Sequence, residues 1–229
     1  MGRVLLFDID GTLLSTQGVG RRAMREAFDA FCGVPTALDN VSFGGMTDRG
    51  LARLGLQAAS APDTEEAIDG LLECYIGCLT RAMVDAPPCI IHPGVHDILE
   101  KVSGVPGVAV GVATGNIEAG AMQKLRHGGL DHWFAFGGYG SDHEIRAELL
   151  RAGWHRGAAQ LGKDPEACDV VVIGDTPRDV SAAHAIGALC ITVTTGTYDA
   201  DALHQAGADQ VVVDLTDPRV PGWLLGEGA

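Results

Sequence analysis

A short apolar segment that ends in two carboxylates constrains the fold of this chain more than any other feature. Residues 4–7 read Val-Leu-Leu-Phe and run into Asp8, Ile9, Asp10 and Gly11. A continuous apolar run of this length is typical of a strand buried on both faces of a parallel sheet. Two carboxylates so close repel each other and need water or a cation. Because ligands bind at the carboxyl ends of such strands, the segment predicts an acidic cation site with one carboxylate free to attack an electrophile.

Strand-like and helix-like segments alternate after this first strand. Helical spacing of apolar residues predicts helices over residues 95–102 and 117–125. Further strands are predicted from apolar runs at residues 108–113, 133–136, 170–173, 189–193 and 210–213. The alternation predicts βαβ units and therefore an α/β fold with a parallel sheet.

One interval, from Leu14 to about Pro88, contains helical patterns and no convincing strand. It predicts either three helices packed on the sheet or a small helical domain inserted after the first strand. The helical patterns cover residues 23–31, 51–59 and 65–83. The Gly- and Pro-rich segment after Pro218 predicts a peripheral tail.

Charge and cysteine content restrict the partners. The formal net charge of −14 argues against binding to a nucleic-acid backbone or an anionic membrane surface. No segment has the pattern of a signal peptide or a membrane span. The six cysteines include Cys74 and Cys78, which share a helix face but lack a second ligand pair, so buried thiols are favoured over a metal site. We expect a cytoplasmic protein with a small-molecule partner; the oligomeric state stays open.

Three segments together resemble the motifs of the haloacid dehalogenase-like hydrolase superfamily. Asp-x-Asp-Gly-Thr-Leu at residues 8–13 resembles the first motif, and a strand ending in Thr114 resembles the second. Gly-Asp-x-x-x-Asp at residues 174–179 resembles the fourth. Their order along the chain makes the resemblance specific, whereas any one of them alone is a weak signal.

The resemblance implies a Rossmann-like parallel sheet core with an inserted helical cap domain. The cap is expected at residues 16–88, and the core at residues 1–15 and 89–229. A cap that opens and closes over the carboxyl end of the sheet would exclude water during the reaction.

The resemblance also implies roles for the first motif. Asp8 attacks a phosphoryl group and forms an aspartyl-phosphate, while Asp10 protonates the leaving group and later deprotonates water. From its residue type alone, Asp10 before Gly11 is more typical of a turn, and the other motifs are what favour catalysis. Repulsion between Asp8 and a phosphoryl group would be offset by Mg²⁺, with Asp8, the backbone carbonyl of Asp10 and Asp175 as expected ligands.

Asp179 and the second motif leave alternatives open. Asp179, one helical turn after Asp175, is expected to ligate the metal through water, to orient a basic residue, or to act as a helix N-terminal carboxylate. Thr114, Gly115 and Asn116 together offer a hydroxyl and backbone N–H groups at a helix N-terminus, which suit a phosphate. The alternative for Asn116 is a simple N-cap.

The third motif of the family normally supplies a lysine, and this chain departs from that pattern. Its three lysines are Lys101, Lys124 and Lys163, and none lies where the motif is expected. Arg146 is the best positional candidate, with Arg151 as the fallback. Arginine holds phosphate with two nitrogens and stays charged, so the replacement is chemically sensible. The alternative for either residue is a surface arginine on an amphipathic helix.

Within the expected cap, Thr47 and Asp48 are candidate N-caps of a helix, followed by Arg49. In the family such a loop contacts the leaving group, so Thr47 and Arg49 are candidate substrate-binding residues. Arg49 would then meet a carboxylate or a second phosphate. A capped helix with a solvated arginine is the alternative.

The absence of certain residues reduces the number of reactions of this superfamily that the chain could catalyse. The resemblance implies a cap lysine for phosphonatases of this superfamily, and no lysine precedes Glu100. It implies a cap histidine and a cap lysine for sugar phosphomutases, and no histidine precedes His92. Both reactions are therefore disfavoured. Haloacid dehalogenases lack the second Asp, which is present here as Asp10. We therefore predict a Mg²⁺-dependent phosphatase acting on a small-molecule phosphate monoester. Phosphoglycolate is a candidate substrate, because the cap layout resembles the phosphoglycolate phosphatase-like branch. The alternatives are a sugar phosphomutase and a non-catalytic phosphate-binding protein on the same fold.

Overall fold

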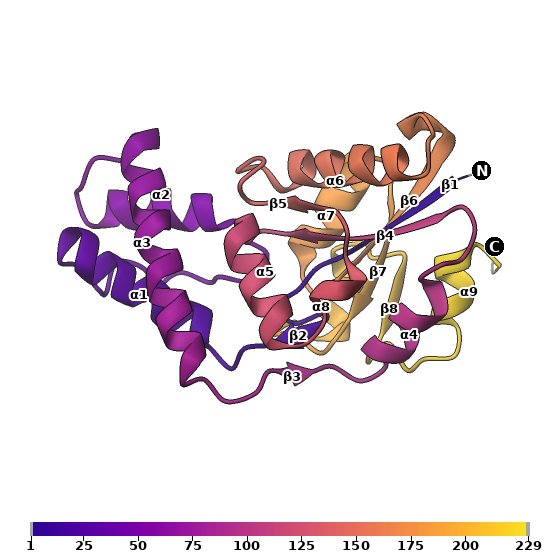
Figure 1. Ribbon diagram of the computed structural model, residues 1–229, viewed down its shortest axis with the longest axis horizontal. Helices are drawn as coiled ribbons and strands as arrows, with labels where there is room; N and C mark the ends of the chain where they lie inside the picture. The colour runs from indigo at the N-terminus through magenta and orange to yellow at the C-terminus, as the bar shows by residue number, and fades with distance from the viewer. Residues whose placement is uncertain (1, 228–229) are drawn as a thin grey trace.

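The computed structural model describes residues 2–227, and a six-stranded parallel sheet forms its centre (Figure 1). The strands lie in the order β5–β4–β1–β6–β7–β8, and every neighbouring pair is parallel. Their bounds are Gly2–Phe7 for β1, Val108–Thr114 for β4, Gly137–Tyr139 for β5, Cys168–Gly174 for β6, Leu189–Val193 for β7 and Gln210–Val212 for β8. The prediction of an α/β fold with a Rossmann-like parallel sheet is confirmed.

Helices cover both faces of this sheet, as Figure 1 shows for α6 and α7 on one side and α4 and α9 on the other. Leu5 and Phe7 of β1 belong to one hydrophobic cluster, whereas Val4 and Leu6 belong to the opposite one. This is the two-residue period of a strand, and burial of both faces explains the continuous apolar run in the sequence. The helices are α4 (Val95–Val102), α5 (Glu118–His127), α6 (Arg146–Gln160), α7 (Pro177–Ala185), α8 (Ala200–Gln205) and α9 (Val220–Leu225).

Three further helices lie together at one end of the molecule, beyond the carboxyl ends of the strands (Figure 1). They are α1 (Val19–Cys32), α2 (Asp48–Ala58) and α3 (Glu65–Val84), and we call them the cap helices. They enclose a hydrophobic cluster of their own, which includes Phe28 and Tyr75. The domain boundaries at residues 16–88 stay a prediction.

Two short strands join the cap helices to the sheet. β2 (Leu14–Ser15) and β3 (Ile90–Ile91) pair antiparallel, where the chain leaves β1 and where it returns. The sequence patterns do not predict them, because two residues are too few to show a strand period.

The strand predicted at residues 133–136 is wrong in position. A 3₁₀ helix occupies Asp131–Trp133, and β5 follows at Gly137–Tyr139. A Cβ atom on Gly138 would lie 1.9 Å from the carbonyl oxygen of Leu149, so only glycine lets α6 approach this strand. A strand built from glycines gives no apolar signal.

Residues 219–227 are not a peripheral tail, which corrects the sequence prediction for this part of the segment after Pro218. They include α9, in which Val220 and Leu224 are fully buried within the cluster that contains α4. The helix begins next to Pro221, a residue that is tolerated in a first turn.

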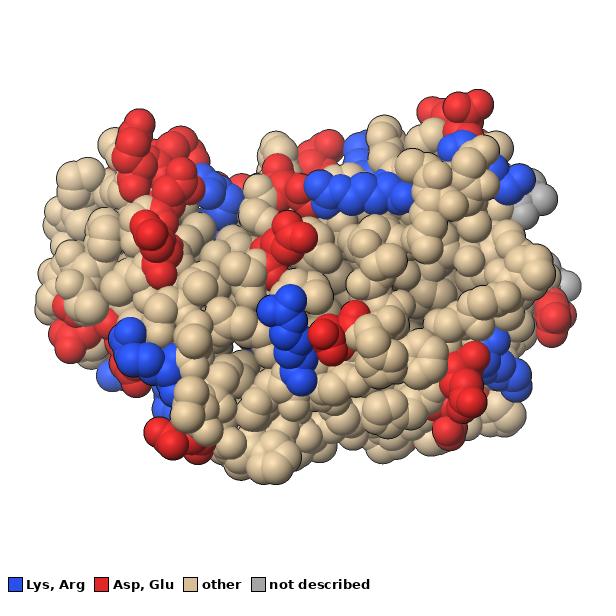
Figure 2. Space-filling view, in the orientation of Figure 1, with Lys and Arg blue, Asp and Glu red and all other residues tan. Residues whose placement is uncertain are grey.

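Figure 2 shows a large group of acidic side chains over the upper part of the cap helices, with smaller acidic groups and scattered Lys and Arg over the rest of this face, the lower part of the cap helices included. This distribution agrees with the strongly negative net charge. Among residues 2–227, each helix is too short or too polar to cross a bilayer. The six cysteines are free. Of the two for which burial was predicted, Cys78 is buried and Cys74 is only half-buried.

Candidate active site

Polar side chains from three strand ends converge on one cavity of about 460 Å³. Asp8 and Asp10 follow β1, Asn116 follows β4, and Asp175 follows β6. These strands are neighbours in the sheet, so their carboxyl ends lie side by side. Residues that are far apart in the sequence are thereby brought together, as the three motifs predict.

The cap helices close the other side of this cavity. Met24 of α1, Leu51 of α2 and Tyr75 of α3 line it, together with Arg21. The cavity therefore lies where the cap helices meet the sheet, which is a position typical of a ligand site.

Three buried carboxylates form an acidic cluster, and two of them, Asp8 and Asp175, line the cavity. Oxygen atoms of Asp8, Asp175 and Asp179 lie within 4.8 Å of one another. Burial raises the pKa of Asp8 to about 7; Arg146 opposes the shift and Asp179 adds to it. Burial, then Asp179 and Asp8, raise the pKa of Asp175 to about 9. A divalent cation with oxygen ligands would relieve this crowding of charge, so the residues present fit Mg²⁺.

Two glycines make room for Asp175. Gly11 has a positive φ of 88°, and a Cβ atom there would lie 2.4 Å from Oδ2 of Asp175. A Cβ atom on Gly196, in the loop after β7, would lie 1.7 Å from the same oxygen. Thr195 Oγ1 donates to the Gly11 carbonyl at 2.6 Å and so joins this loop to the first motif. Gly196 was not predicted as a site residue, because its one signal in the sequence is its place after a predicted strand.

Arg146, the first residue of α6, lies beside Asp8. Its Nη2 atom is 3.1 Å from Asp8 Oδ1, and its Nε atom donates to Asp179 Oδ1 at 2.8 Å. The side chain is 8% exposed. Burial lowers the pKa of Arg146, but Asp179 and Asp8 outweigh burial and raise it above its ordinary value. The alternative candidate, Arg151, pairs with Glu148 on the outside of α6 and is 43% exposed.

The guanidinium group of Arg146 is paired with two carboxylates. Its buried Nη2 atom lies 2.5 Å from Asp179 Oδ1 and 3.1 Å from Asp8 Oδ1. A guanidinium group has five N–H donors in a planar fork, so a paired arginine can still donate to a further oxygen. The side chain is therefore placed to donate to a phosphoryl oxygen next to Asp8.

Asp179 serves two purposes at once. Its Oδ2 atom accepts from the backbone N–H of Thr176 at 3.0 Å and from the Thr176 hydroxyl at 2.7 Å, which completes a capping box at the start of α7. Its Oδ1 atom accepts from Arg146. Both the helix N-terminal and the arginine-orienting interpretations of Asp179 thus describe its contacts.

The second motif turns its polar groups towards the first. Thr114 is buried, and its Oγ1 atom accepts from the Asn116 backbone N–H at 3.2 Å and from Asn116 Nδ2 at 2.7 Å. The N-cap interpretation of Asn116 is wrong: α5 begins after Ile117, and the Asn116 amide is drawn to Asp10 instead, at 2.8 Å. Gly115 is tightly enclosed, since a Cβ atom there would lie 2.0 Å from the Met46 carbonyl oxygen in the cap.

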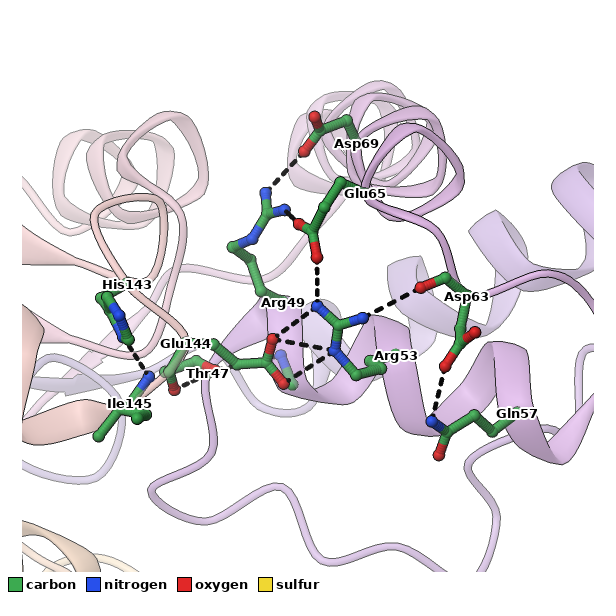
Figure 3. A network of polar contacts seen from close by, with 11 residues as sticks. Thr47, Arg49, Arg53, Gln57, Asp63, Glu65, Asp69, His143, Glu144 and Ile145 are labelled. Carbon is green, nitrogen blue, oxygen red and sulfur yellow. Dashed lines mark hydrogen bonds and ion pairs between the residues drawn. The ribbon is translucent and has the colours of Figure 1, made fainter.

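Thr47 and Arg49 lie outside the cavity, so the structure does not bring these two predicted substrate-binding residues to the site. Thr47 is the N-cap of α2, and its hydroxyl also donates to the Glu144 carbonyl at 3.1 Å. Arg49 pairs with Glu65 and, at 2.6 Å, with Asp69, both on α3 (Figure 3). These acceptors inside the cap hold Arg49 away from the cavity.

Asp48 lines the cavity instead, although the sequence suggested only a capping role. Its carboxylate accepts from the backbone N–H of Ile117 at 2.9 Å, and its own N–H donates to the Gly115 carbonyl at 2.7 Å. Burial raises the pKa of Asp48 to about 6, against the opposing charge of Lys124. Asp48 therefore fastens the start of α2 to the second motif.

Lys124 is the other residue that the sequence analysis set aside. It lies in α5, is 5% exposed, and places its Nζ atom 2.5 Å from Asp10 Oδ2 and 2.7 Å from Asn116 Oδ1. The available signal is its place within the apolar stripe of Ala121 and Leu125, where a lysine needs a partner to be buried.

Comparison with known proteins agrees with this geometry. The family model for haloacid dehalogenase-like hydrolases matches residues 3–187. The validoxylamine A 7'-phosphate phosphatase of Streptomyces hygroscopicus subsp. limoneus is 28% identical over 225 residues, which cover 96% of this chain and 98% of that protein.

Solved structures share the whole fold. A predicted phosphatase from Clostridium acetobutylicum has a TM-score of 0.70 at 19% identity over 99% of both chains. CbbY from Rhodobacter sphaeroides, in complex with phosphate, has a TM-score of 0.68 at 21% identity over 95% of this chain and 96% of that one. The chain belongs to the haloacid dehalogenase-like hydrolases and, as its motifs predict, is an enzyme of the phosphatase class in that family.

Proposed function

We propose that this phosphatase hydrolyses a small-molecule phosphate monoester, with Mg²⁺, through an aspartyl-phosphate on Asp8. The observation that carries the proposal is the buried guanidinium group of Arg146, which lines the cavity with its Nη2 atom 3.1 Å from Asp8 Oδ1. A phosphoryl group that accepts from this nitrogen would be held next to the carboxylate that attacks it.

Asp8, Asp175 and the backbone carbonyl of Asp10 are the groups that would hold the cation. Asp179 would act through Arg146, because both of its oxygens already accept from protein donors. When bound, Mg²⁺ supplies positive charge that offsets the repulsion between Asp8 and the phosphoryl oxygens. It would also stabilise the ionised forms of Asp8 and Asp175, whose burial disfavours them.

In the first step, an Asp8 oxygen forms a bond to phosphorus while the ester P–O bond breaks. The electron pair of that bond stays on the leaving oxygen, which takes a proton from Asp10. Arg146 holds the phosphoryl oxygens as charge moves between them, and the backbone N–H group of Gly115, which lines the cavity, suits the same role.

In the second step, water attacks phosphorus and gives its proton to Asp10. The bond between phosphorus and the Asp8 oxygen breaks, and inorganic phosphate leaves. The carboxylate of Asp8 and the protonated form of Asp10 are thereby restored, so one cycle consumes one ester and one water.

The leaving group would occupy the part of the cavity that the cap helices close. This part combines the apolar Met24 and Leu51 with the polar Arg21, Asp48 and Tyr75. Such a lining suits a polar leaving group, and the relative's name identifies validoxylamine A 7'-phosphate as one phosphate ester that a similar protein hydrolyses. Phosphoglycolate remains a candidate. We also propose that residues 16–88 move as the cap that admits the substrate.

Phosphate release from a panel of esters tests the proposal. The panel contains p-nitrophenyl phosphate, phosphoglycolate, a hexose 6-phosphate and glycerol 2-phosphate, each with Mg²⁺ or with a chelator. We expect Mg²⁺-dependent release that Asp8→Asn reduces by at least about 10⁴-fold, since the nucleophile is lost. Circular dichroism would establish that the variant is folded. Release by Asp8→Asn at the wild-type rate would contradict the nucleophile assignment. A sugar phosphomutase or a non-catalytic binding protein would release no phosphate from any ester.

A further inference from the structure

Lys124 is a buried cation that the proposed reaction does not use. It comes from the middle of α5, outside every motif that the sequence shows. Its Nζ atom nevertheless lies in the cavity, between Asp10 and Asn116. Burying a lysine costs free energy unless its ammonium group is paired. The partners of the Lys124 ammonium group therefore indicate its role.

The ammonium group fixes the orientation of Asn116. Lysine can only donate hydrogen bonds, so Asn116 must turn its Oδ1 atom towards Nζ, at 2.7 Å. The Nδ2 atom then points the other way and donates to Asp10 at 2.8 Å and to Thr114 at 2.7 Å. Because a carboxylate accepts and an ammonium group donates, Asp10 and Lys124 together fix which end of the Asn116 amide faces each of them.

Both donors reach the same oxygen of Asp10. Lys124 Nζ lies 2.5 Å and Asn116 Nδ2 lies 2.8 Å from Oδ2. The Asp10 side chain is otherwise 42% exposed, so these two contacts are what restrain its rotation within the described part of the chain. Oδ1 is the oxygen left for proton transfer.

We propose that Lys124 is a positioning residue for Asp10: it holds Oδ2 directly and, through Asn116, a second time, so that Oδ1 faces the leaving-group oxygen. This inference rests on the proposed function, in which Asp10 protonates the leaving group. A proton donor works only within hydrogen-bond reach of the atom it protonates, so loss of this restraint reduces proton transfer.

A purely structural role for Lys124 would have a different consequence. In that case the lysine would only neutralise nearby carboxylates such as Asp48, and its loss would slow every substrate alike. The leaving group separates the two roles. An alkoxide must be protonated as it departs, whereas p-nitrophenolate leaves as a stable anion and gains little from a proton donor.

The experiment compares glycerol 2-phosphate with p-nitrophenyl phosphate for wild type and Lys124→Met, which keeps the aliphatic stem and removes the ammonium group. The value of kcat/KM reports steps up to release of the leaving group, so it excludes the later attack by water. We expect Lys124→Met to lower kcat/KM about 100-fold for glycerol 2-phosphate and less than about fivefold for p-nitrophenyl phosphate.

Two further variants complete the test. Lys124→Arg keeps a cationic donor and should restore the ratio of the two kcat/KM values towards that of wild type. Lys101→Met, which removes an exposed lysine of α4, should leave the ratio unchanged. Lys124→Gln, with a neutral donor, serves if Lys124→Met does not fold, and circular dichroism is the check.

Equal losses for the two esters in Lys124→Met, or no loss for either, would overturn the positioning role while the phosphatase remained established by wild-type turnover. A folded wild-type enzyme that hydrolyses neither ester would overturn the proposed function and this inference with it.

Discussion

Arg53 of α2 and Glu144, in the loop before α6, form an ion pair that joins the cap helices to the core (Figure 3). Arg53 Nε lies 3.2 and 3.1 Å from the two carboxylate oxygens, and Nη2 donates at 3.0 Å. Glu144 lies two residues before Arg146, and its backbone carbonyl accepts from Thr47. One loop thus carries both a contact to the cap and the arginine beside Asp8.

Removal of this ion pair is expected to weaken closure of the cap. Arg53→Met should raise KM several-fold, because the cap helices line the leaving-group side of the cavity. A double-mutant cycle with Glu144→Gln should give a coupling energy of about 0.5–1 kcal/mol, since both side chains are partly exposed. The cycle is required because Arg53 also contacts Glu65.

The control for that prediction is Arg25→Met. Arg25 pairs with Asp39 at 2.7 Å, and neither residue contributes to the contact with the core described here. Its KM should stay at the wild-type value. Fully additive effects of Arg53→Met and Glu144→Gln would contradict a direct energetic link.

Arg146 and Arg151 are expected to differ sharply in their effect on turnover. Arg146→Ala removes the buried donor beside Asp8 and should lower kcat/KM by about 10²–10³. Arg151→Ala removes an exposed pair with Glu148 and should change stability by less than about 0.5 kcal/mol with normal activity. Steady-state kinetics on p-nitrophenyl phosphate measures both.

Arg146→Lys belongs in the same experiment, because Arg146→Ala leaves Asp8 and Asp179 buried without their cation, which destabilises a fold. The lysine variant keeps the charge and should recover part of the lost activity. A larger loss in Arg151→Ala than in Arg146→Ala would move the third motif to Arg151.

Much of the fold follows from local patterns in the sequence. Strands buried on both faces, such as residues 4–7 and 170–173, are continuous apolar runs, and their polar ends meet because parallel strands end at one edge. β5 escaped prediction because close packing against α6 requires glycine there. Local patterns thus show an element wherever apolar side chains build it.

Contacts between elements that are distant in the sequence are harder to predict from local patterns. The positions of Asp8, Asp10 and Asp175 are predictable, because each follows directly from a strand end. Lys124 reaches Asp10 only through the way α5 lies against the loop after β1. No local pattern encodes such an approach, and a buried lysine in an apolar stripe is its only trace.

Magnesium is expected to stabilise the protein through Asp175. Burial raises the pKa of this carboxyl from 3.8 to about 9, so folding favours its protonated form. The stability it contributes is present below about pH 4 and is lost as the pH rises towards 9. At pH 8, Mg²⁺ should therefore raise the melting temperature of wild type, whereas Asp175→Asn should melt higher than wild type in chelator and gain little from Mg²⁺.

Differential scanning fluorimetry measures these melting temperatures with Mg²⁺, with Ca²⁺ as a second cation and with chelator. Asp169→Asn is the control variant, because Asp169 lies in β6 and is partly exposed. An Asp175→Asn variant whose melting temperature rises with Mg²⁺ as much as that of wild type would place the cation elsewhere.

Asp48 is expected to make the stability of the protein depend on pH, because its carboxyl group is buried between the cap helices and the second motif. Burial raises its pKa from 3.8 to about 6, so its contribution to stability is lost as the pH rises through this range. Asp48→Asn keeps an oxygen for the N–H of Ile117 and removes the charge.

The free energy of unfolding of Asp48→Asn, relative to that of wild type, should rise by at most about 3 kcal/mol between pH 4 and pH 6 and stay level above pH 6. Urea unfolding in chelator measures the difference. The control is Asp217→Asn, since hydrogen bonds from Arg219 lower the pKa of Asp217 to about 2, below this window. A flat difference for both variants would show that Asp48 ionises as freely in the folded chain as in the unfolded one.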